Sequence, residues 1–189
     1  MRITGGAWVR RRVPGPPRGA ALRPTPDVLR EQAFAILARN LEGAAFLDLF
    51  AGTGVNALEA LSRGAARAVL VDNDPRSLQL IRANLVQFEA QARADVVGAE
   101  AHEAVARLAR QGRQFSLCWC DPPFYHWELG MDALAVARAV GVLPAGALVV
   151  VETPPRAAVE LEGFDVVRAL RGAVLVRLHE TSVQRAPGG

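Results

Sequence analysis

Short apolar runs alternate with amphipathic stretches between residues 45 and 153. The apolar runs are continuous, as in parallel strands that are buried on both faces. The stretches between them carry apolar residues at helical spacing. This succession predicts an α/β fold, a doubly wound parallel sheet with helices on both faces. The expected strands are 45–51, 67–73, 94–100, 115–121 and 146–153, and the expected helices are 55–64, 74–88, 102–112 and 128–141.

The last part of the chain departs from this alternation. Residues 164–170 and 173–180 are apolar runs separated only by Arg171-Gly172, which predicts a tight hairpin. Two antiparallel strands are therefore expected to complete an otherwise parallel sheet. The tail, 181–189, is expected to be frayed.

The first part of the chain also differs. Residues 2–13 predict a short β-hairpin around Gly5-Gly6, and a connector rich in proline and glycine follows. A helix is expected from Pro26, with Thr25 as its N-cap. The expected organisation is an arm and connector over 1–24, a main domain over 25–180 and the tail over 181–189.

Length and composition fit one domain with a small appendage. The chain has 189 residues, of which 51% are hydrophobic. Its apolar runs are strand-sized, far below the roughly 18 residues of a membrane span. We therefore expect a cytoplasmic protein.

Charge is unevenly distributed. The first 30 residues contain seven arginines and one acid, Asp27. Such a basic arm is typical of a segment that contacts phosphates, although a solvated surface has the same composition. The candidate RNA-binding residues are Arg10, Arg11, Arg12 and Arg23.

Two residue types, lysine and cysteine, limit the reactions and cofactors that are expected for this protein. The chain contains no lysine, which excludes a Walker A loop and a pyridoxal-phosphate Schiff base. Its only cysteines, Cys118 and Cys120, share a strand face and are expected to be buried core residues. No cluster of metal-ligating residues is evident, so no metal is expected.

A cofactor site is expected at the carboxyl ends of the first strands. Gly52 and Gly54 follow the first strand, and Asp72 ends the second, twenty residues after Gly52. These residues fit either NAD or S-adenosylmethionine. Asp48 favours S-adenosylmethionine, because a carboxylate attracts its ammonium and repels a pyrophosphate. Glu100 is expected to accept from the adenine amine. The candidate cofactor-binding residues are Asp48, Phe50, Gly52, Gly54, Asp72, Asn73, Glu100 and Ala101.

The segment "DPPF" follows the fourth strand at the same edge of the sheet. A residue before proline is held extended, so the acceptors of Asp121 and Pro122 can point into a site. They are suited to accept the two hydrogens of an aromatic amine, while Phe124 stacks on the base. The candidate catalytic residues are Asp121, Pro122, Pro123 and Phe124. Tyr125, His126 and Trp127 either extend this aromatic wall or simply pack.

These motifs resemble a known family. "LDLFAGTG", "VLVDND" and "DPPF", together with "MRITGGAWVRRR" and "LRPTPDVLREQAFAIL", are similar to the RsmD family over about residues 1–179. That family methylates the exocyclic N2 amine of a guanine in 16S ribosomal RNA. The resemblance implies a class I methyltransferase fold with seven strands, the last reversed. It further implies S-adenosylmethionine as cofactor and 16S ribosomal RNA, free or in the small ribosomal subunit, as partner of a monomer.

The resemblance also assigns roles. It implies that Asp121, Pro122 and Phe124 hold the guanine, and that Asp48, Gly52, Asp72 and Glu100 surround the cofactor. Phe124 stands where the family usually has tyrosine, Asp72 where glutamate is usual and Glu100 where aspartate is usual.

Three alternatives remain open at this point. The first is methylation of another nucleic-acid amine, such as adenine N6. The second is an NAD-dependent oxidoreductase, which leaves "DPPF" and the arginine arm unexplained. The third is an RNA-binding module without activity.

Overall fold

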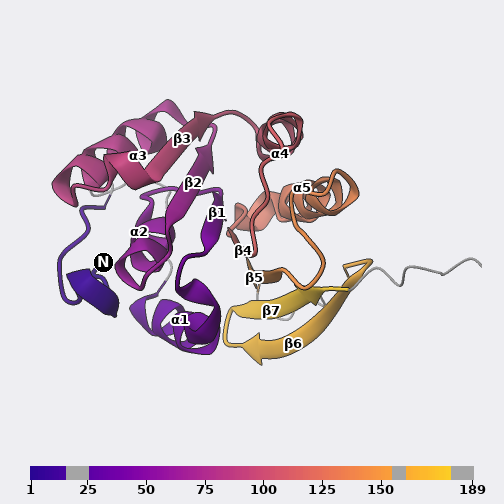
Figure 1. Ribbon diagram of the computed structural model, residues 1–189, viewed down its shortest axis with the longest axis horizontal. Coiled ribbons are helices and arrows are strands. Elements are labelled where there is room, and N and C mark those ends of the chain that lie inside the picture. The colour runs from indigo at the N-terminus through magenta and orange to yellow at the C-terminus, as the bar shows by residue number, and fades with distance from the viewer. Residues whose placement is uncertain (16–25, 155–160, 180–189) are drawn as a thin grey trace, which may run out of the picture.

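A single mixed sheet forms the centre of the molecule. The computed structural model describes residues 1–15, 26–154 and 161–179. Its strands are β1 Ala45–Leu49, β2 Arg67–Asp72, β3 Ala94–Gly98, β4 Leu117–Cys120, β5 Leu148–Glu152, β6 Phe164–Leu170 and β7 Ala173–Leu178. They lie in the order β3-β2-β1-β4-β5-β7-β6 (Figure 1). The strands predicted from residue 45 onward are all present, and the seven-stranded sheet is confirmed.

Helices cover both faces of this sheet. The α-helices are α1 Asp27–Leu41, α2 Val55–Ser62, α3 Pro75–Gln87, α4 Ala101–Arg110 and α5 Glu128–Ala139, and single 3-10 turns are η1 Gly6–Trp8, η2 Gln91–Arg93 and η3 Phe124–His126. Figure 1 shows α1, α2 and α3 on one side of the sheet and α4 and α5 on the other. The doubly wound α/β fold is therefore confirmed.

Alternating side chains of the strands supply two separate cores. On β1, Phe46 packs into the core beneath α1, α2 and α3, while Leu47 packs into the core beneath α4 and α5. Both faces of the strand are therefore apolar, which explains the continuous apolar runs in the sequence. Cys118 and Cys120 are fully buried in the second core, as predicted.

The chain reverses its direction of winding between β1 and β4. Both strands are parallel, and Leu49 of β1 lies opposite Cys120 of β4. Strands β2 and β3 extend the sheet on one side of this pair, and β5 extends it on the other. The carboxyl ends of β1 and β4 thus flank a topological switch point, where ligands of such sheets bind.

The C-terminal hairpin is confirmed. Strands β6 and β7 pair antiparallel, and β7 also pairs antiparallel with β5. Arg171 and Gly172 form the turn between them. The tail, 181–189, lies outside the described residues.

The N-terminal arm differs from the predicted β-hairpin. Residues 1–13 do run antiparallel, but the pairing is one isolated bridge between Arg2 and Arg12, not two regular strands. The turn η1 and the left-handed backbone of Arg10, with φ 69°, lie between the paired ends. The turn is therefore broader than a tight turn at Gly5-Gly6, and this part of the prediction is wrong.

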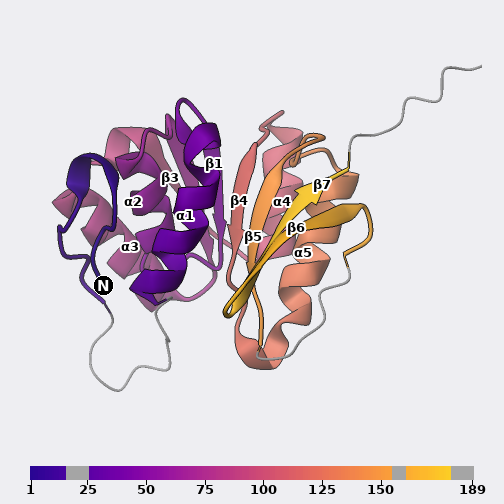
Figure 2. The ribbon, with the colours of Figure 1, turned by 90° about the horizontal axis from the view of Figure 1, so that it is seen from below.

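Polar contacts hold the arm against α2. Glu59 of α2 has no exposed surface, and its carboxylate accepts from both the backbone N–H and the hydroxyl of Thr4, each at 2.8 Å. Arg63 Nε lies 2.7 Å and buried Arg30 Nε lies 3.4 Å from the same carboxylate. A buried ion-pair network of this kind needs every partner, because an unpaired buried charge is costly. The arm is consequently part of the packed domain (Figure 2).

Helix α1 begins at Asp27, one residue later than predicted, with Pro26 in the N-cap position. Thr25, the predicted N-cap, lies outside the described residues. Helix α3 begins as predicted: the Asp74 side chain caps it by accepting from Arg76 N at 3.0 Å, and Pro75 is its first residue. Among the helices of the described part of the chain, none has the length and apolar character needed to cross a bilayer.

Candidate functional site

The glycine loop after β1 is shaped by two residues with positive φ. Gly52 has φ 55° and Gly54 has φ 75°, a region that side chains with a Cβ rarely adopt. A Cβ on Gly54 would lie 2.8 Å from Leu70 Cδ2, so this glycine lets α2 approach β2. A Cβ on Gly52 would meet nothing closer than 4.0 Å. The loop thus packs tightly on its protein side and leaves backbone accessible at Gly52.

Asp72 at the end of β2 is tied to this loop. Its Oδ2 accepts from Gly52 N at 2.8 Å, and its Oδ1 accepts from Asp74 N at 2.9 Å. Burial raises the pKa of Asp72, although these backbone donors oppose the shift. Each carboxylate oxygen keeps a second lone pair, so the group can still accept hydrogen bonds from a ligand.

The side chain of Asp48 lies in the protein interior and not on the surface of the candidate site. It is fully buried, and its Oδ2 accepts from Ala57 N at 3.0 Å in the first turn of α2. Its Oδ1 has no hydrogen-bond partner within the described structure. Burial, together with the nearby carboxylates of Asp72 and Glu152, raises the pKa of Asp48 well above its ordinary value. Asp48 therefore stabilises the start of α2, and its contact with a ligand ammonium stays a prediction.

The loops after β2 and β3 lie side by side. Asn73 Nδ2 donates to Glu100 Oε1 at 2.7 Å, and both side chains are exposed. Glu100 precedes α4, whose first residue, Ala101, is buried. Phe50, in a left-handed conformation with φ 63°, leads from β1 into the glycine loop. One edge of the sheet thus brings together Phe50, Gly52, Asp72, Asn73 and Glu100, because β2, which ends in Asp72, lies between β1 and β3.

Asp121 lies across the switch point from the glycine loop. Its backbone N donates to Leu49 O at 3.3 Å, which places it beside the end of β1. The next residue, Pro122, is buried against α5. A Cβ on Gly130 of α5 would lie 2.7 Å from Pro122 Cγ and 3.0 Å from Cys120 Sγ. Residues 121–124, the "DPPF" segment that we call the clamp, are therefore held in place by close packing behind them.

The rest of the clamp segment faces solvent. Pro123, with φ −56°, precedes the turn η3, and His126 N donates to Pro123 O at 2.8 Å. Phe124 is 41% exposed and Tyr125 is 92% exposed, whereas Trp127 is half-buried. The structure thus brings the predicted clamp and the predicted cofactor loop to the same edge, on neighbouring strands.

The arginines of the arm have different environments. The Arg11 guanidinium stacks 4.4 Å from the centre of the Phe88 ring and donates to Gln87 O at 2.8 Å, so it helps to attach the arm to α3. Arg10 and Arg12 are exposed, and their guanidinium groups make no ion pair or hydrogen bond with other described residues. Arg23 lies outside the described residues.

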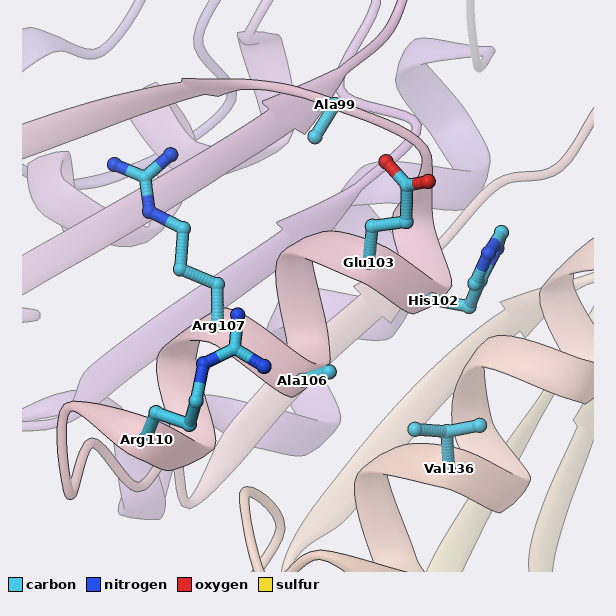
Figure 3. Close-up of a pocket in the computed structure, with 7 residues that line it drawn as sticks. All are labelled: Ala99, His102, Glu103, Ala106, Arg107, Arg110 and Val136. Atoms are coloured by element: carbon cyan, nitrogen blue, oxygen red, sulfur yellow. The ribbon is translucent and has the colours of Figure 1, made fainter.

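A surface hollow lies along α4. It has a volume of about 540 Å³ and is lined by residues of α4, by Ala99 and by Val136 of α5 (Figure 3). His102 and Glu103 line its part near the start of α4, and Arg107 and Arg110 come from later turns. None of the predicted site residues lines it, so it is separate from the candidate site.

Sequence reasoning missed Asn84. This α3 residue is almost fully buried, and its Nδ2 donates to Thr53 O of the glycine loop at 2.9 Å and to Pro14 O of the arm at 3.1 Å. The sequence does contain an indication of this role, because Asn84 lies on the apolar face of α3 between Ile81 and Leu85. A polar residue on a buried face must find partners, and here the partners are the loop and the arm.

Comparison with solved structures defines the class of the fold. A methyltransferase from Escherichia coli matches with a TM-score of 0.79 and 29% identity, over 95% of this chain and 98% of that chain. A methylase from Haemophilus influenzae matches with a TM-score of 0.73 and 25% identity, over 94% and 96%. A methyltransferase complexed with SAH shares the fold alone, at 14% identity and a TM-score of 0.64, over 80% and 50%. The fold is thus that of class I methyltransferases.

Sequence comparison then identifies the family. The model of the family described as "Conserved hypothetical protein 95" matches residues 1–178, and the chain belongs to this family. Ribosomal RNA small subunit methyltransferase D of Escherichia coli is 41% identical over 124 residues, which are 66% of this chain and 60% of that protein. The protein of the same name from Haemophilus influenzae is 30% identical over 81% of this chain and 78% of its own length. The predicted membership of the RsmD family is confirmed, and the relatives give no support to an NAD-dependent oxidoreductase.

Proposed function

We propose that this protein transfers a methyl group from S-adenosylmethionine to the exocyclic N2 amine of a guanine in small-subunit ribosomal RNA. One observation carries the proposal: the "DPPF" segment and the glycine loop meet across the switch point, where Asp121 N donates to Leu49 O. In this proposal an acceptor pair for an amine and a cradle for the methyl donor would share one edge of the sheet. The names of the relatives support methyl transfer to small-subunit ribosomal RNA, and the choice of guanine N2 is part of the proposal.

The residues present fit S-adenosylmethionine. Gly52 offers open backbone, and the exposed pair Asn73 and Glu100 lies beside it with polar groups for an adenine. Asp72 would accept from the ribose hydroxyls while it holds Gly52 in place. Oδ1 of Asp48 has no hydrogen-bond partner among the described residues, although the Asn56 side chain lies close enough to lower the pKa of this carboxyl group in part. An ammonium reaching this oxygen would satisfy it and favour the ionised carboxylate.

The clamp residues orient the amine. When bound, S-adenosylmethionine supplies a sulfonium methyl that reacts with a nucleophilic nitrogen. The Asp121 carboxylate and the Pro122 carbonyl would accept the two amine hydrogens, which directs the nitrogen lone pair away from the base ring. Phe124 would stack on the base. As the bond from this nitrogen to the methyl carbon forms, the bond from that carbon to sulfur would break and leave a neutral thioether, and the amine proton would pass along its hydrogen bond to the Asp121 carboxylate. Placement of acceptors and reactants would contribute most of the rate.

The substrate must present an unpaired base. An amine in a stacked duplex cannot reach the clamp, so the target guanine has to be flipped out or single-stranded. The exposed Arg10 and Arg12 would hold nearby phosphates. We propose that the protein acts as a monomer in the cytoplasm, on free 16S ribosomal RNA or on the small subunit. Adenine N6 is the alternative amine that the clamp also fits.

The proposal is tested with labelled S-adenosylmethionine and unmodified small-subunit ribosomal RNA, offered both free and as particles. We expect transfer by the wild type and none by Asp121→Ala, whose affinity for the cofactor should stay within a few-fold of wild type. The matched control is Asp132→Ala, an exposed acid on α5, which should transfer normally. Transfer by Asp121→Ala would contradict the clamp.

A further inference from the structure

The exposed aromatic side chains of this protein are concentrated in one place. Among the described phenylalanine, tyrosine and tryptophan residues, Phe124 and Tyr125 are the only exposed ones, and they are the two residues after Pro123. The other described phenylalanine and tryptophan side chains are buried or half-buried. Tyrosine usually buries most of its ring, so a Tyr125 side chain that is 92% exposed leaves a large aromatic surface in water. Such a surface beside a candidate active site indicates a contact with the substrate.

The backbone that carries these rings is firmly held. Pro122 is wedged against Gly130, where even one additional carbon atom would lie 2.7 Å from Pro122 Cγ. Pro123 fixes its own φ, and His126 N closes the turn η3 by donating to Pro123 O at 2.8 Å. The two rings are therefore presented by a short rigid turn that begins next to Asp121. Rigid aromatics lose little conformational freedom when they bind.

We propose that Tyr125 stacks on an unpaired nucleotide adjacent to the target base, so that the substrate is RNA that is single-stranded on at least one side of the guanine. The inference rests on the proposed function, in which Phe124 is used by the target base itself. One ring stacks one base face, so a second exposed ring on the same turn is available for the neighbouring base. The rings provide stacking surface, and the arginines of the arm provide charge for the phosphates.

The position of Tyr125 predicts which class of RNA the protein methylates. A guanine flipped out of a continuous duplex leaves its neighbours stacked in the helix, where Tyr125 has no base to contact. A guanine in a loop or strand end has an unstacked neighbour, which is how proteins recognise RNA sequence most often. The neighbour is read by stacking, so its identity should matter less than its being unpaired.

The main test compares Tyr125→Ala with Tyr125→Phe. Loss of one stacked base should raise Kd and KM for unmodified small-subunit RNA by roughly 5- to 150-fold in Tyr125→Ala. Tyr125→Phe keeps the ring and should stay close to wild type, and cofactor affinity should be unchanged in both. The control is Val28→Ala, which removes an apolar side chain that is 64% exposed on α1. Equal RNA affinity for Tyr125→Ala and wild type would overturn the inference.

A second readout does not depend on catalysis. Tyr125 is the only tyrosine in the chain, so labelling with 3-fluorotyrosine gives a single fluorine resonance. We expect this resonance to shift on addition of a short single-stranded RNA containing one guanine, and to stay in place with the same strand in a blunt duplex. RNA binding without a shift would overturn the stacking contact. Absence of methyl transfer by the wild type, in contrast, would reject the proposed function while the fluorine result still decides whether Tyr125 stacks.

Discussion

The backbone N–H of Gly52 donates a 2.8 Å hydrogen bond to Oδ2 of Asp72, which joins the loop after β1 to the end of β2. The second oxygen of the same carboxylate caps the next turn by accepting from Asp74 N. One side chain thereby sets the shape of two loops at the candidate cofactor edge. Its role in the proposed complex is therefore both to hold backbone and to accept from a ligand.

This relationship gives the first prediction. In Asp72→Asn, the amide can replace only one of the two acceptors, so one backbone N–H loses its partner and the ribose loses a charged acceptor. Hydrogen bonds to charged groups contribute about 1.5–3 kcal/mol, so the affinity for S-adenosylmethionine should fall by roughly 10- to 150-fold. Isothermal titration calorimetry measures this, with Asp132→Asn as the exposed control. Unchanged affinity would remove Asp72 from the cofactor site.

The buried Asp48 gives a pH dependence. Burial raises the pKa of Asp48 well above its ordinary value of 3.8, so between these two pKa values the folded state holds a proton that the unfolded state has lost. The free energy of unfolding therefore declines as pH rises through this window. Asp48→Asn removes this pH-dependent contribution to the free energy of unfolding. The variant should gain stability relative to wild type as pH rises above 3.8, and the gain should level off once Asp48 has ionised in the folded state.

Urea unfolding at a series of pH values, without cofactor, measures the difference for Asp48→Asn. Below 3.8 the carboxyl is protonated in both states, so the difference between the two proteins should be independent of pH. Burial also raises the pKa of Asp72, and its carboxylate acts on Asp48, so the two proteins are compared again in an Asp72→Asn background, where the pH dependence of the difference should remain. A difference that stays constant over the whole range would contradict a raised pKa at Asp48.

Close packing behind the clamp gives a prediction about Gly130. A Cβ here would collide with Pro122 Cγ at 2.7 Å, so Gly130→Ala should displace the clamp segment. Overpacking costs about 1–3 kcal/mol, partly offset by the higher helix propensity of alanine. We expect reduced methyl transfer with cofactor affinity unchanged. Ala135→Gly, at an exposed position of the same helix, should lower stability by about 1 kcal/mol and leave transfer intact. Full activity of Gly130→Ala would show that the clamp tolerates displacement.

The arm arginines separate into two groups. Replacing Arg10 and Arg12 together by glutamine should weaken RNA binding and reduce the slope of log K against log salt by roughly 1.4–1.8, with little effect on stability. Arg11→Gln should instead lower stability by about 1 kcal/mol, because it loses the contacts with Phe88 and Gln87. Filter binding at several salt concentrations and urea unfolding distinguish these effects. The exposed pair Arg39 and Arg177 serves as the charge-matched control.

The core architecture was predictable because it depends on local patterns. Continuous apolar runs such as 67–73 identify buried strands, and the spacing of Gly52 and Asp72 follows from one strand–helix–strand unit. The winding order then places their carboxyl ends at one edge. The C-terminal hairpin followed from Arg171-Gly172 in the same way.

The contacts that were missed are those between segments far apart in the sequence. Glutamate usually lies on the solvent-exposed face of a helix, yet Glu59 is fully buried and contacts Thr4, Arg30 and Arg63. Its burial depends on where the arm packs, and local patterns contain no information on that. The same holds for Arg11, whose charge suggested phosphate binding and whose stacking on Phe88 depends on the docked arm.

The identity of the methylated nucleoside tests the central claim most directly. Unmodified small-subunit RNA, free and in particles, is incubated with the protein and labelled S-adenosylmethionine, digested to nucleosides and separated. We predict label in N2-methylguanosine alone, and none when Asp121→Ala replaces the wild type. Label in another nucleoside, such as N6-methyladenosine, would contradict the assignment of guanine N2. Absence of label with cofactor bound to folded protein would contradict methyl transfer itself.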